Sequence, residues 1–236
     1  MSVAGSLASL YRTHLAQFPQ RSILIEGGRA LSYSAFDAQV SQTCAWLSRQ
    51  GVMQGSRVAV WLVNRSEWLV LFFALAKLGA TLIAVNTKYR SHELQNILGN
   101  SQASLLVLQL NFRKIDFAQV IEGVDGAQLP WLQKIVMLDA GHDTPNELLG
   151  KPVIAFDAIA SGNDPAAPHQ STPTNDEVYA DALAAFFTTS GTTKGPKLVM
   201  HTQRTLTEHA SDVARGYDFE QEGNRLLCAL PFCGVF

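Results

Sequence analysis

The strongest constraint in this sequence is an alternation of short apolar runs with segments of helical periodicity. The mostly apolar runs span 58–63, 81–85, 105–108 and 134–138. A strand that is apolar at nearly every position suits a sheet buried on both faces. Helical segments are expected between these runs at 67–78, 92–98 and 117–121. The alternation therefore predicts βαβ units and an α/β fold, with a mainly parallel sheet that has helices on both faces.

The two ends of the chain add further expected elements. A helix over 7–18 is closed by Pro19, and a hairpin follows with Gly27 and Gly28 at its turn. Ser34 and Ser66 are expected to cap the next two helices. Near the other end we expect a strand over 182–187, a helix over 202–215 and a final strand over 225–230.

A change of composition divides the chain. Residues 161–176 contain three prolines and no large apolar side chain, which is typical of an exposed linker. We therefore expect a first α/β subdomain over 1–160, a linker over 161–176, and the start of a second subdomain over 177–236.

Composition excludes several classes of protein. Apolar residues make up 47% of the chain and charged residues 16%, which excludes a disordered polyampholyte. A net charge of -2 predicts no nucleic-acid partner. The most apolar stretch, 68–76, is too short for a transmembrane segment, which needs about 20 residues. Cys44, Cys228 and Cys233 are an odd number without a CxxC pair, so we expect no disulfide framework and a cytoplasmic location.

The last residues are unusually apolar. The run 226–236 ends at Phe236, whereas domains usually finish with polar residues that tolerate fraying. We therefore expect the chain to be the front part of a longer protein, and to self-associate or to pair with the missing carboxy-terminal portion.

The stretch 187–201 has the composition of an anion-binding loop. Hydroxyl side chains, two glycines and two lysines lie between two apolar strands. Such a loop can point several backbone N–H groups at anionic oxygens, and Lys197 can supply a point charge to a phosphate. An ordinary polar hairpin has a similar composition. The Walker pattern GxxxxGK[ST] does not fit, because Pro196 and an apolar strand follow Gly195.

The spacing in this loop resembles the adenylate-forming superfamily, which includes acyl-CoA synthetases. The family's loop reads Thr-Ser-Gly-Thr-Thr-Gly-x-Pro-Lys-Gly. The matching positions are Thr189, Ser190, Gly191, Thr192, Thr193, Pro196 and Lys197. Lys194 stands where the family has Gly, with Gly195 beside it, and Leu198 replaces the last Gly.

The resemblance extends along essentially the whole chain. The stretches 55–68, 78–80 and 86–98 follow the family's order at compatible spacing, and the family's chains are about twice as long. The run 230–236 resembles Leu-Pro-Leu-Phe-His-Val-Phe, whose Phe–His pair lies near the carboxylate substrate. Here Cys233 and Gly234 take those places. We expect Cys233 to be a small pocket-wall residue rather than a nucleophile, because no base is placed by sequence to activate it. We likewise expect His201 and His209 to be solvated or core residues.

The resemblance implies the amino-terminal part of the large domain of an ATP-dependent carboxylate–CoA ligase. The substrates and cofactors would be a small-molecule carboxylic acid, ATP, Mg²⁺ and coenzyme A. Lys197 would be catalytic, acting on the departing pyrophosphate, and the nucleotide-binding residues would be Thr189, Ser190, Gly191, Thr192, Thr193, Lys194, Gly195 and Lys197. The family's metal-binding Glu, ribose-binding Asp and catalytic Lys would lie beyond Phe236, so no metal ligand is expected in this chain.

Three alternatives stay open at this point. The chain could be an inactive α/β unit that serves only in folding or assembly. It could be part of an adenylation domain that loads a carrier-protein thiol. A stand-alone nucleotide-binding module ranks last, because the expected adenine and ribose contacts are missing.

Overall fold

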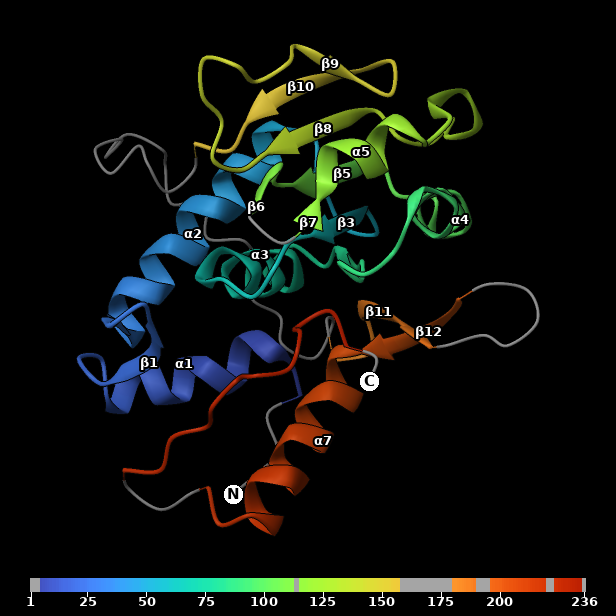
Figure 1. Cartoon of the computed structure of the whole chain (residues 1–236). Helices are drawn as coiled ribbons and strands as arrows, with labels where there is room; N and C mark the ends of the chain where they lie inside the picture. Colours follow the sequence, from blue (N-terminus) through green and yellow to red (C-terminus); the bar gives the residue numbers. More distant parts are fainter. Residues whose placement is uncertain (1–4, 113–114, 158–179, 190–195, 220–222, 235–236) are drawn as a thin grey trace.

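An eight-stranded sheet with the strand order β12-β11-β4-β3-β5-β8-β10-β9 forms the centre of the molecule (Figure 1). The computed structural model describes residues 5–112, 115–157, 180–189, 196–219 and 223–234. The strands are β1 (Ser22–Glu26), β2 (Arg29–Ser32), β3 (Arg57–Trp61), β4 (Thr81–Ala84), β5 (Leu105–Leu108), β6 (Asn111–Phe112), β7 (Ile115–Asp116), β8 (Lys134–Met137), β9 (Glu147–Leu148), β10 (Lys151–Ala155), β11 (Leu183–Thr189) and β12 (Lys197–Thr202). The helices are α1 (Leu7–Gln17), α2 (Tyr33–Arg49), α3 (Ser66–Lys77), α4 (Ser91–Ser101), α5 (Phe117–Glu122), η1 (Gly126–Gln128) and α7 (Gln203–Gly216).

The predicted parallel sheet is confirmed. The six strands from β11 across to β10 run parallel to their neighbours, whereas β12 and β9 join the two edges antiparallel. All residues of β4 and β5 are buried, as their apolar sequences, interrupted only by Thr81 at the start of β4, predict. Strands from both sides of the predicted linker lie in this one sheet, since β11 pairs with β4. The division into two subdomains stays a prediction, and the predicted linker lies outside the described residues.

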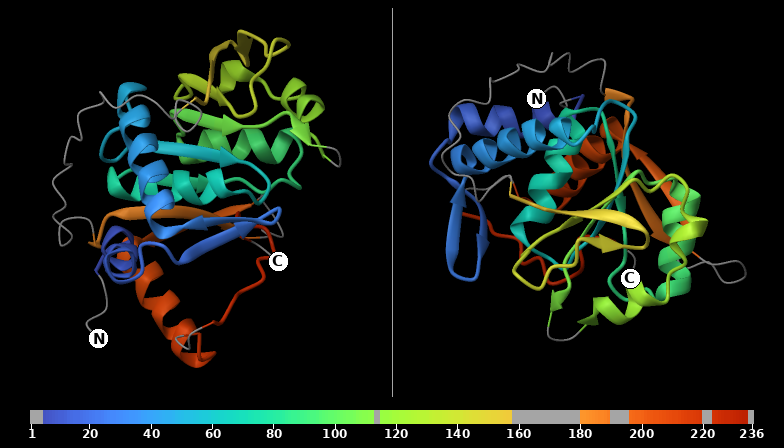
Figure 2. Two further views of the ribbon diagram at one scale, coloured as in Figure 1. Left: turned by 90° about the vertical axis from the view of Figure 1, so that its left-hand side faces the viewer. Right: turned by 90° about the horizontal axis from the view of Figure 1, so that it is seen from above.

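Helices cover both faces of the sheet, as predicted (Figure 2). On one face α2 and α3 pack against the sheet in a cluster that includes Leu47, Leu71 and Leu75. On the other face α4 and α5 contribute Ile97 and Phe117 to a second cluster. No helix within the described ranges is long and apolar enough to cross a membrane.

The first and last helices meet beside β11. α1 and α7 lie next to each other (Figure 2), and the side chain of Gln203 at the start of α7 reaches the first residue of α1. The hairpin β1–β2 after α1 turns at Gly27 and Gly28, whose φ values of 54° and 81° are in the left-handed region that favours glycine. The predicted two-glycine turn is therefore confirmed.

Three local predictions are wrong. Ser32, not Ser34, caps α2: its extended backbone lets its hydroxyl accept from Ala35 N. Ser66 is the first residue of α3 rather than its cap, and its hydroxyl donates to Glu26. The expected strand over 225–230 is a segment without a backbone ladder, in which the carbonyl oxygens of Cys228 and Leu230 accept from the side chain of Asn64 rather than from a neighbouring strand.

Candidate functional site

The carboxyl ends of β3, β4, β5, β8 and β11 meet at one edge of the sheet, because these strands are parallel. From β3 the chain continues into α3 on one face, and from β4 it continues into α4 on the opposite face. Open α/β sheets bind ligands outside the carboxyl ends of strands where the chain changes face in this way. The edge beside β3 and β4 is therefore the candidate site.

The sequence-predicted loop begins and ends at this edge. Thr189, the last residue of β11, is the Cα partner of Lys197, the first residue of β12. Paired residues of an antiparallel ladder point to the same face, and both side chains are exposed. The other predicted binding residues, Ser190, Gly191, Thr192, Thr193, Lys194 and Gly195, lie outside the described residues. The structure thus brings together the two described members of the predicted set.

Thr188 ties the base of this hairpin to the rest of the edge. The hydroxyl of Tyr89 donates to Oγ1 of Thr188 over 2.7 Å, and Thr188 is buried. Burial raises the pKa of Tyr89, so the phenol keeps the proton that it donates. Tyr89 ends a turn in which Oδ1 of Asn86 accepts from Lys88 N over 2.9 Å. Sequence reasoning missed both residues, although Thr188 is the next-to-last residue of β11 and Tyr89 lies in the segment that connects β4 to α4.

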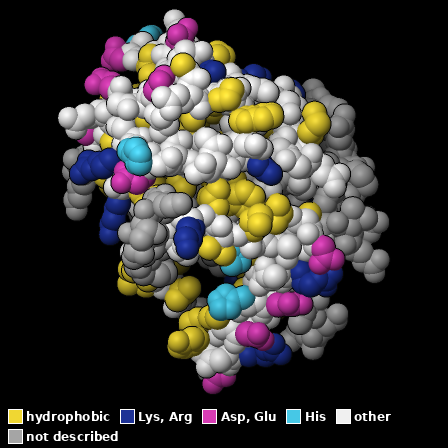
Figure 3. All heavy atoms as spheres, turned by 90° about the vertical axis from the view of Figure 1, so that its right-hand side faces the viewer, with side chains coloured by type: hydrophobic (Ala, Val, Ile, Leu, Met, Phe, Trp, Pro, Cys, Tyr) yellow, Lys and Arg dark blue, Asp and Glu magenta, His cyan; other side chains and the backbone are white. Residues whose placement is uncertain are grey.

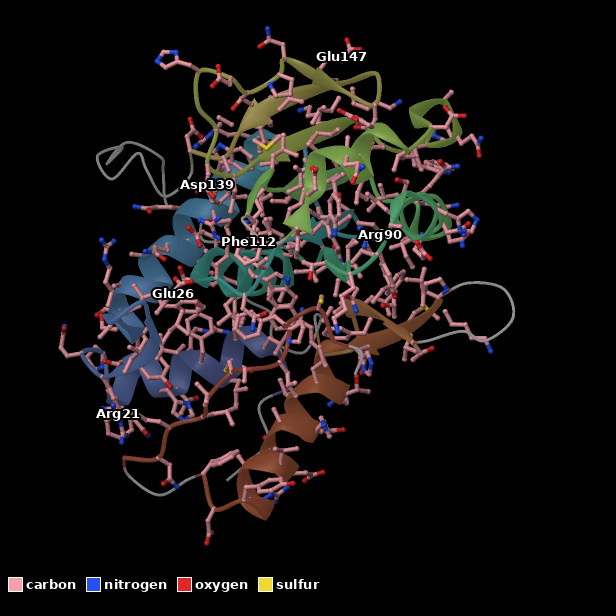
Figure 4. The ribbon with its side chains drawn as sticks, viewed as in Figure 1. Arg21, Glu26, Arg90, Phe112, Asp139 and Glu147 are labelled. Atoms are coloured by element: carbon pink, nitrogen blue, oxygen red, sulfur yellow. The ribbon has the colours of Figure 1, made fainter. Side chains whose placement is uncertain are left out.

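An open pocket of about 210 Å³ lies at the same edge. Its lining residues come from the segments after β3 and β4, from β6 and β7, and from the carboxy-terminal segment: Leu62, Val63, Asn64, Thr87, Phe112, Ile115, Ala229 and Pro231. Phe112 is labelled in Figure 4, in the middle of the view. The lining is mostly apolar, which suits an apolar part of a ligand better than a phosphate.

Cys233 lies close to the pocket but does not line it. The thiol side chain is 2% exposed and packs in the same core cluster as α3 and Phe232. Burial raises the pKa of this thiol, against an opposing backbone hydrogen bond from Thr87. Cys233 is not among the lining residues of this pocket, and its expected role in the wall of a carboxylate pocket stays a prediction. A buried thiol with a raised pKa is also a poor nucleophile.

Arg65 joins the ends of two strands at the edge. Its guanidinium donates to both carboxylate oxygens of Glu67 over 2.8 Å and to Asp139, which follows β8, over 2.6 Å. Burial opposes charge on Glu67, but the hydrogen bonds and charge of Arg65 outweigh it and hold the pKa of Glu67 below its usual range. Figure 4 labels Asp139 and also Glu26, which accepts from Ser66. The guanidinium is thus already matched by carboxylates and is not a free anion site.

The histidines near the site show no metal-binding arrangement. The ring of His201 lies 5.6 Å from that of Phe187, and His209 is exposed on α7. Within the described parts of the chain, no group of three or more His, Cys, Asp or Glu side chains could hold a metal ion. On the face shown in Figure 3, basic and acidic side chains are interspersed, and hydrophobic side chains are exposed between them.

Comparison with known proteins identifies relatives of the whole chain. A sequence profile described as AMP-binding enzyme matches residues 11–236. The chain is 31% identical over 219 residues to an indenyl-propanoyl:CoA ligase of Mycobacterium tuberculosis, covering 92% of this chain and 40% of the relative. It is 28% identical over 203 residues to the medium-chain fatty-acid–CoA ligase of Escherichia coli, covering 86% of this chain and 34% of the relative. The chain therefore spans two fifths or less of the length of these two relatives.

Solved structures show the same fold. The N-terminal domain of FACL13 from Mycobacterium tuberculosis aligns with 97% of this chain at a TM-score of 0.69 and 23% identity, covering 52% of that domain. The anthranilate CoA ligase AuaEII, in complex with anthranoyl-AMP, aligns with 86% of this chain at a TM-score of 0.66 and 23% identity, covering 36% of that protein. The predicted fold class, the amino-terminal part of an acyl-CoA ligase-like domain, is confirmed.

Proposed function

The chain belongs to the family of AMP-binding enzymes, and we propose that it forms the amino-terminal part of an ATP-dependent carboxylate–CoA ligase. In the first step of this reaction a carboxylate attacks the α-phosphate of ATP, giving an acyl-adenylate and pyrophosphate. In the second step the thiol of coenzyme A attacks the acyl carbon, and AMP leaves. The curated relatives described above are CoA ligases by name, which supports this reaction.

The observation that carries the proposal is the pairing of Thr189 with Lys197 at the carboxyl edge of the sheet. These two residues enclose the stretch 190–195, which holds the other hydroxyl and glycine residues of the family-like loop. We assign nucleotide binding to the hydroxyl and glycine residues of 189–195 and to Lys194 and Lys197. The Lys197 ammonium would stabilise negative charge as it develops on the departing pyrophosphate.

The remaining edge supports this role by holding the hairpin in place. The Tyr89–Thr188 hydrogen bond fixes the residue next to Thr189 against the turn after β4. Hydrogen-bond donors that are already fixed in place stabilise a phosphate effectively, because they need little reorganisation as negative charge develops during the reaction. Tyr89 and Thr188 thus position the loop and make no contact with phosphate in this proposal.

Mg²⁺ is implied by the family, but the described residues do not fit a site for it. No cluster of carboxylates, cysteines or histidines of the required size occurs among them. We therefore assign no metal ligand to the described chain and derive no step through the ion.

The class of acid is proposed only as a small-molecule carboxylic acid, with fatty acids as one candidate. The relatives' names range from medium-chain fatty acid to crotonobetaine or carnitine. Coenzyme A is favoured over a carrier-protein thiol, because the matched relatives are named as CoA ligases. We propose the cytoplasm as the location, since all three cysteines are free thiols.

ATP–pyrophosphate exchange tests the proposal. The exchange would be measured with a panel of carboxylic acids for the 236-residue chain, and for a protein in which this chain is continued to the length of its relatives. We expect exchange only from the longer protein, because alignment of reactants supplies about 7–11 kcal/mol of such barriers and needs the whole site. Absence of exchange from the longer protein with every acid would favour an inactive assembly unit. Formation of acyl-CoA by the 236-residue chain alone would overturn the proposal that the reaction needs a longer protein.

A further inference from the structure

The segment 228–232 crosses the carboxyl edge of the sheet without a neighbouring strand. The side chain of Asn64 forms the hydrogen bonds that a neighbouring strand would otherwise form. Nδ2 of Asn64 donates to the carbonyl oxygens of Leu230 over 2.8 Å and of Cys228 over 3.3 Å. Oδ1 of Asn64 accepts from the backbone N–H of Phe232 over 2.7 Å.

This contact needs a carboxamide. Asn has two donors and one acceptor group on a short stem, and all of these groups are matched by the alternate residues 228, 230 and 232. An Asp side chain would place only hydrogen-bond acceptors against the two carbonyl oxygens, and an Ala side chain has no hydrogen-bonding group. The pattern of partners also fixes which side of the amide carries the nitrogen.

Burial of the segment begins just after the residues that Asn64 holds. Leu226, Leu227 and Leu230 are 70%, 87% and 60% exposed, whereas Cys233 is 2% exposed. The ring of Phe232 lies 5.5 Å from that of Trp68. Gly234 follows with φ of +69°, so close to Phe187 that an added Cβ would lie 2.9 Å from the ring.

The same segment contributes to the wall of the open pocket. Ala229 and Pro231 alternate with the residues that Asn64 binds, and they line the pocket together with Leu62 and Val63. A segment that left the edge would therefore remove one wall of the pocket and uncover Cys233.

We infer that Asn64 is a positioning residue that fixes segment 228–234 on the carboxyl edge of the sheet, and thereby sets one wall of the pocket and the burial of Cys233. In the ligase proposed above, on which this consequence rests, the segment packs against Phe187 at the base of the loop hairpin. Asn64 would then set the distance between the pocket wall and the loop at Thr189.

The three thiols of the chain allow a direct test. Cys228 is exposed and serves as a reference, Cys44 is buried between α2 and α3 and reports on the whole fold, and Cys233 reports on the segment. The rate of reaction of each thiol with dithiodipyridine would be followed by mass spectrometry of peptides. For Asn64→Ala we expect the Cys233 rate, relative to Cys228, to rise about tenfold or more, because three hydrogen bonds that oppose local opening are lost. The Cys44 rate should not change, and Asn100→Ala, an exposed change on α4, should leave all three rates unchanged.

A second variant separates positioning from general destabilisation. Asn64→Asp keeps the size and the acceptor but loses the donors. At neutral pH its carboxylate faces the carbonyl oxygens of Leu230 and Cys228, and Cys233 should be uncovered as in Asn64→Ala. Below about pH 4 the protonated carboxyl can donate one hydrogen bond, so the Cys233 rate relative to Cys228 should fall in Asn64→Asp and not in Asn64→Ala.

Two results would overturn the inference. One is a Cys233 that stays protected in both variants. The other is a Cys44 rate that rises in step with Cys233, which would show that Asn64 acts on the whole fold. If Asn64→Ala does not fold, the pH profile of Asn64→Asp decides by itself. The labelling needs neither ATP nor coenzyme A, so its outcome is independent of the ligase reaction.

Discussion

The backbone N–H of Leu7 donates to Oε1 of Gln203 over 3.1 Å, although 196 positions separate the two residues. Nε2 of the same carboxamide donates to the carbonyl oxygen of Ala76 over 2.9 Å. Gln203 is fully buried. One side chain at the start of α7 therefore holds the beginning of α1 and the end of α3 together beside the β11–β12 hairpin.

Gln203→Ala should lower the free energy of unfolding by about 1–3 kcal/mol, because it leaves the buried N–H of Leu7 without a partner and removes one hydrogen bond to the carbonyl of Ala76, which keeps its bond from Gly79 N. Urea denaturation followed by circular dichroism measures this difference. Glu208→Gln, an exposed change on the same helix, is the control. A Gln203→Ala midpoint equal to that of the control would show that water satisfies the N–H of Leu7 once the carboxamide is removed.

The parallel sheet could be predicted because strands that are buried on both faces have nearly continuous apolar sequences. β5 is apolar throughout and β4 is apolar after Thr81, and short runs of this kind are typical of strands buried on both faces. β10 was not predicted, because Lys151 and Pro152 interrupt its apolar pattern. β10 is the strand next to the edge strand β9; its residues are only partly buried, and Lys151 and Pro152 pair with the short β9 rather than with β8.

Polar residues that act through long-range contacts could not be predicted. Gln is usually exposed, so nothing in the local sequence indicates that Gln203 is buried. Asn64 follows a buried strand, which marks it as an edge residue, but its partners lie more than 160 positions away. The apolar run 225–230 suggested a strand from composition alone. Whether such a run joins a ladder depends on a free sheet edge, which is a property of the assembled fold.

Glu67→Gln should destabilise the protein at pH 7 and make it less sensitive to acid. The ion pair with Arg65 is partly buried, with 19% and 25% of the two side chains exposed. The pKa of Glu67 is lowered in the folded state, so its stabilisation is present above the unfolded value of about 4.3 and is lost as the pH falls through the folded value. We expect a loss of about 1–2 kcal/mol at pH 7 that shrinks below about pH 4.

Thermal unfolding of both proteins between pH 3 and pH 7 measures this effect. Glu147→Gln is the control, since Glu147 is exposed on β9 and is labelled at the far end of the molecule in Figure 4. A difference between wild type and Glu67→Gln that stays constant over the whole pH range would contradict the assignment.

Lys197→Ala in the longer ligase should slow formation of the adenylate more than transfer of the acyl group to the thiol. Loss of one charged contact in such a site costs about 2–4 kcal/mol of transition-state stabilisation, or roughly 30- to 800-fold in rate. ATP–pyrophosphate exchange reports the first step, and reaction of a preformed acyl-adenylate with coenzyme A reports the second. Lys197→Arg should retain part of the rate because the charge is kept. Equal slowing of both steps would argue against a role at the pyrophosphate.

Three exposed leucines in and before the segment that Asn64 holds predict self-association of the 236-residue chain. Leu226, Leu227 and Leu230 are between 60% and 87% exposed, and full burial of one leucine contributes about 1.5–3 kcal/mol. Replacing both Leu226 and Leu227 by Ser should therefore weaken self-association at least about a hundredfold, as measured by sedimentation velocity over a range of concentrations. Met53→Ser, which removes an exposed apolar side chain after α2, should leave association unchanged. In a protein continued to the length of its relatives we expect the same leucines to be covered within the chain, and the wild-type sequence to be monomeric at this surface. Equal association of the double variant and the wild type would place the contact elsewhere.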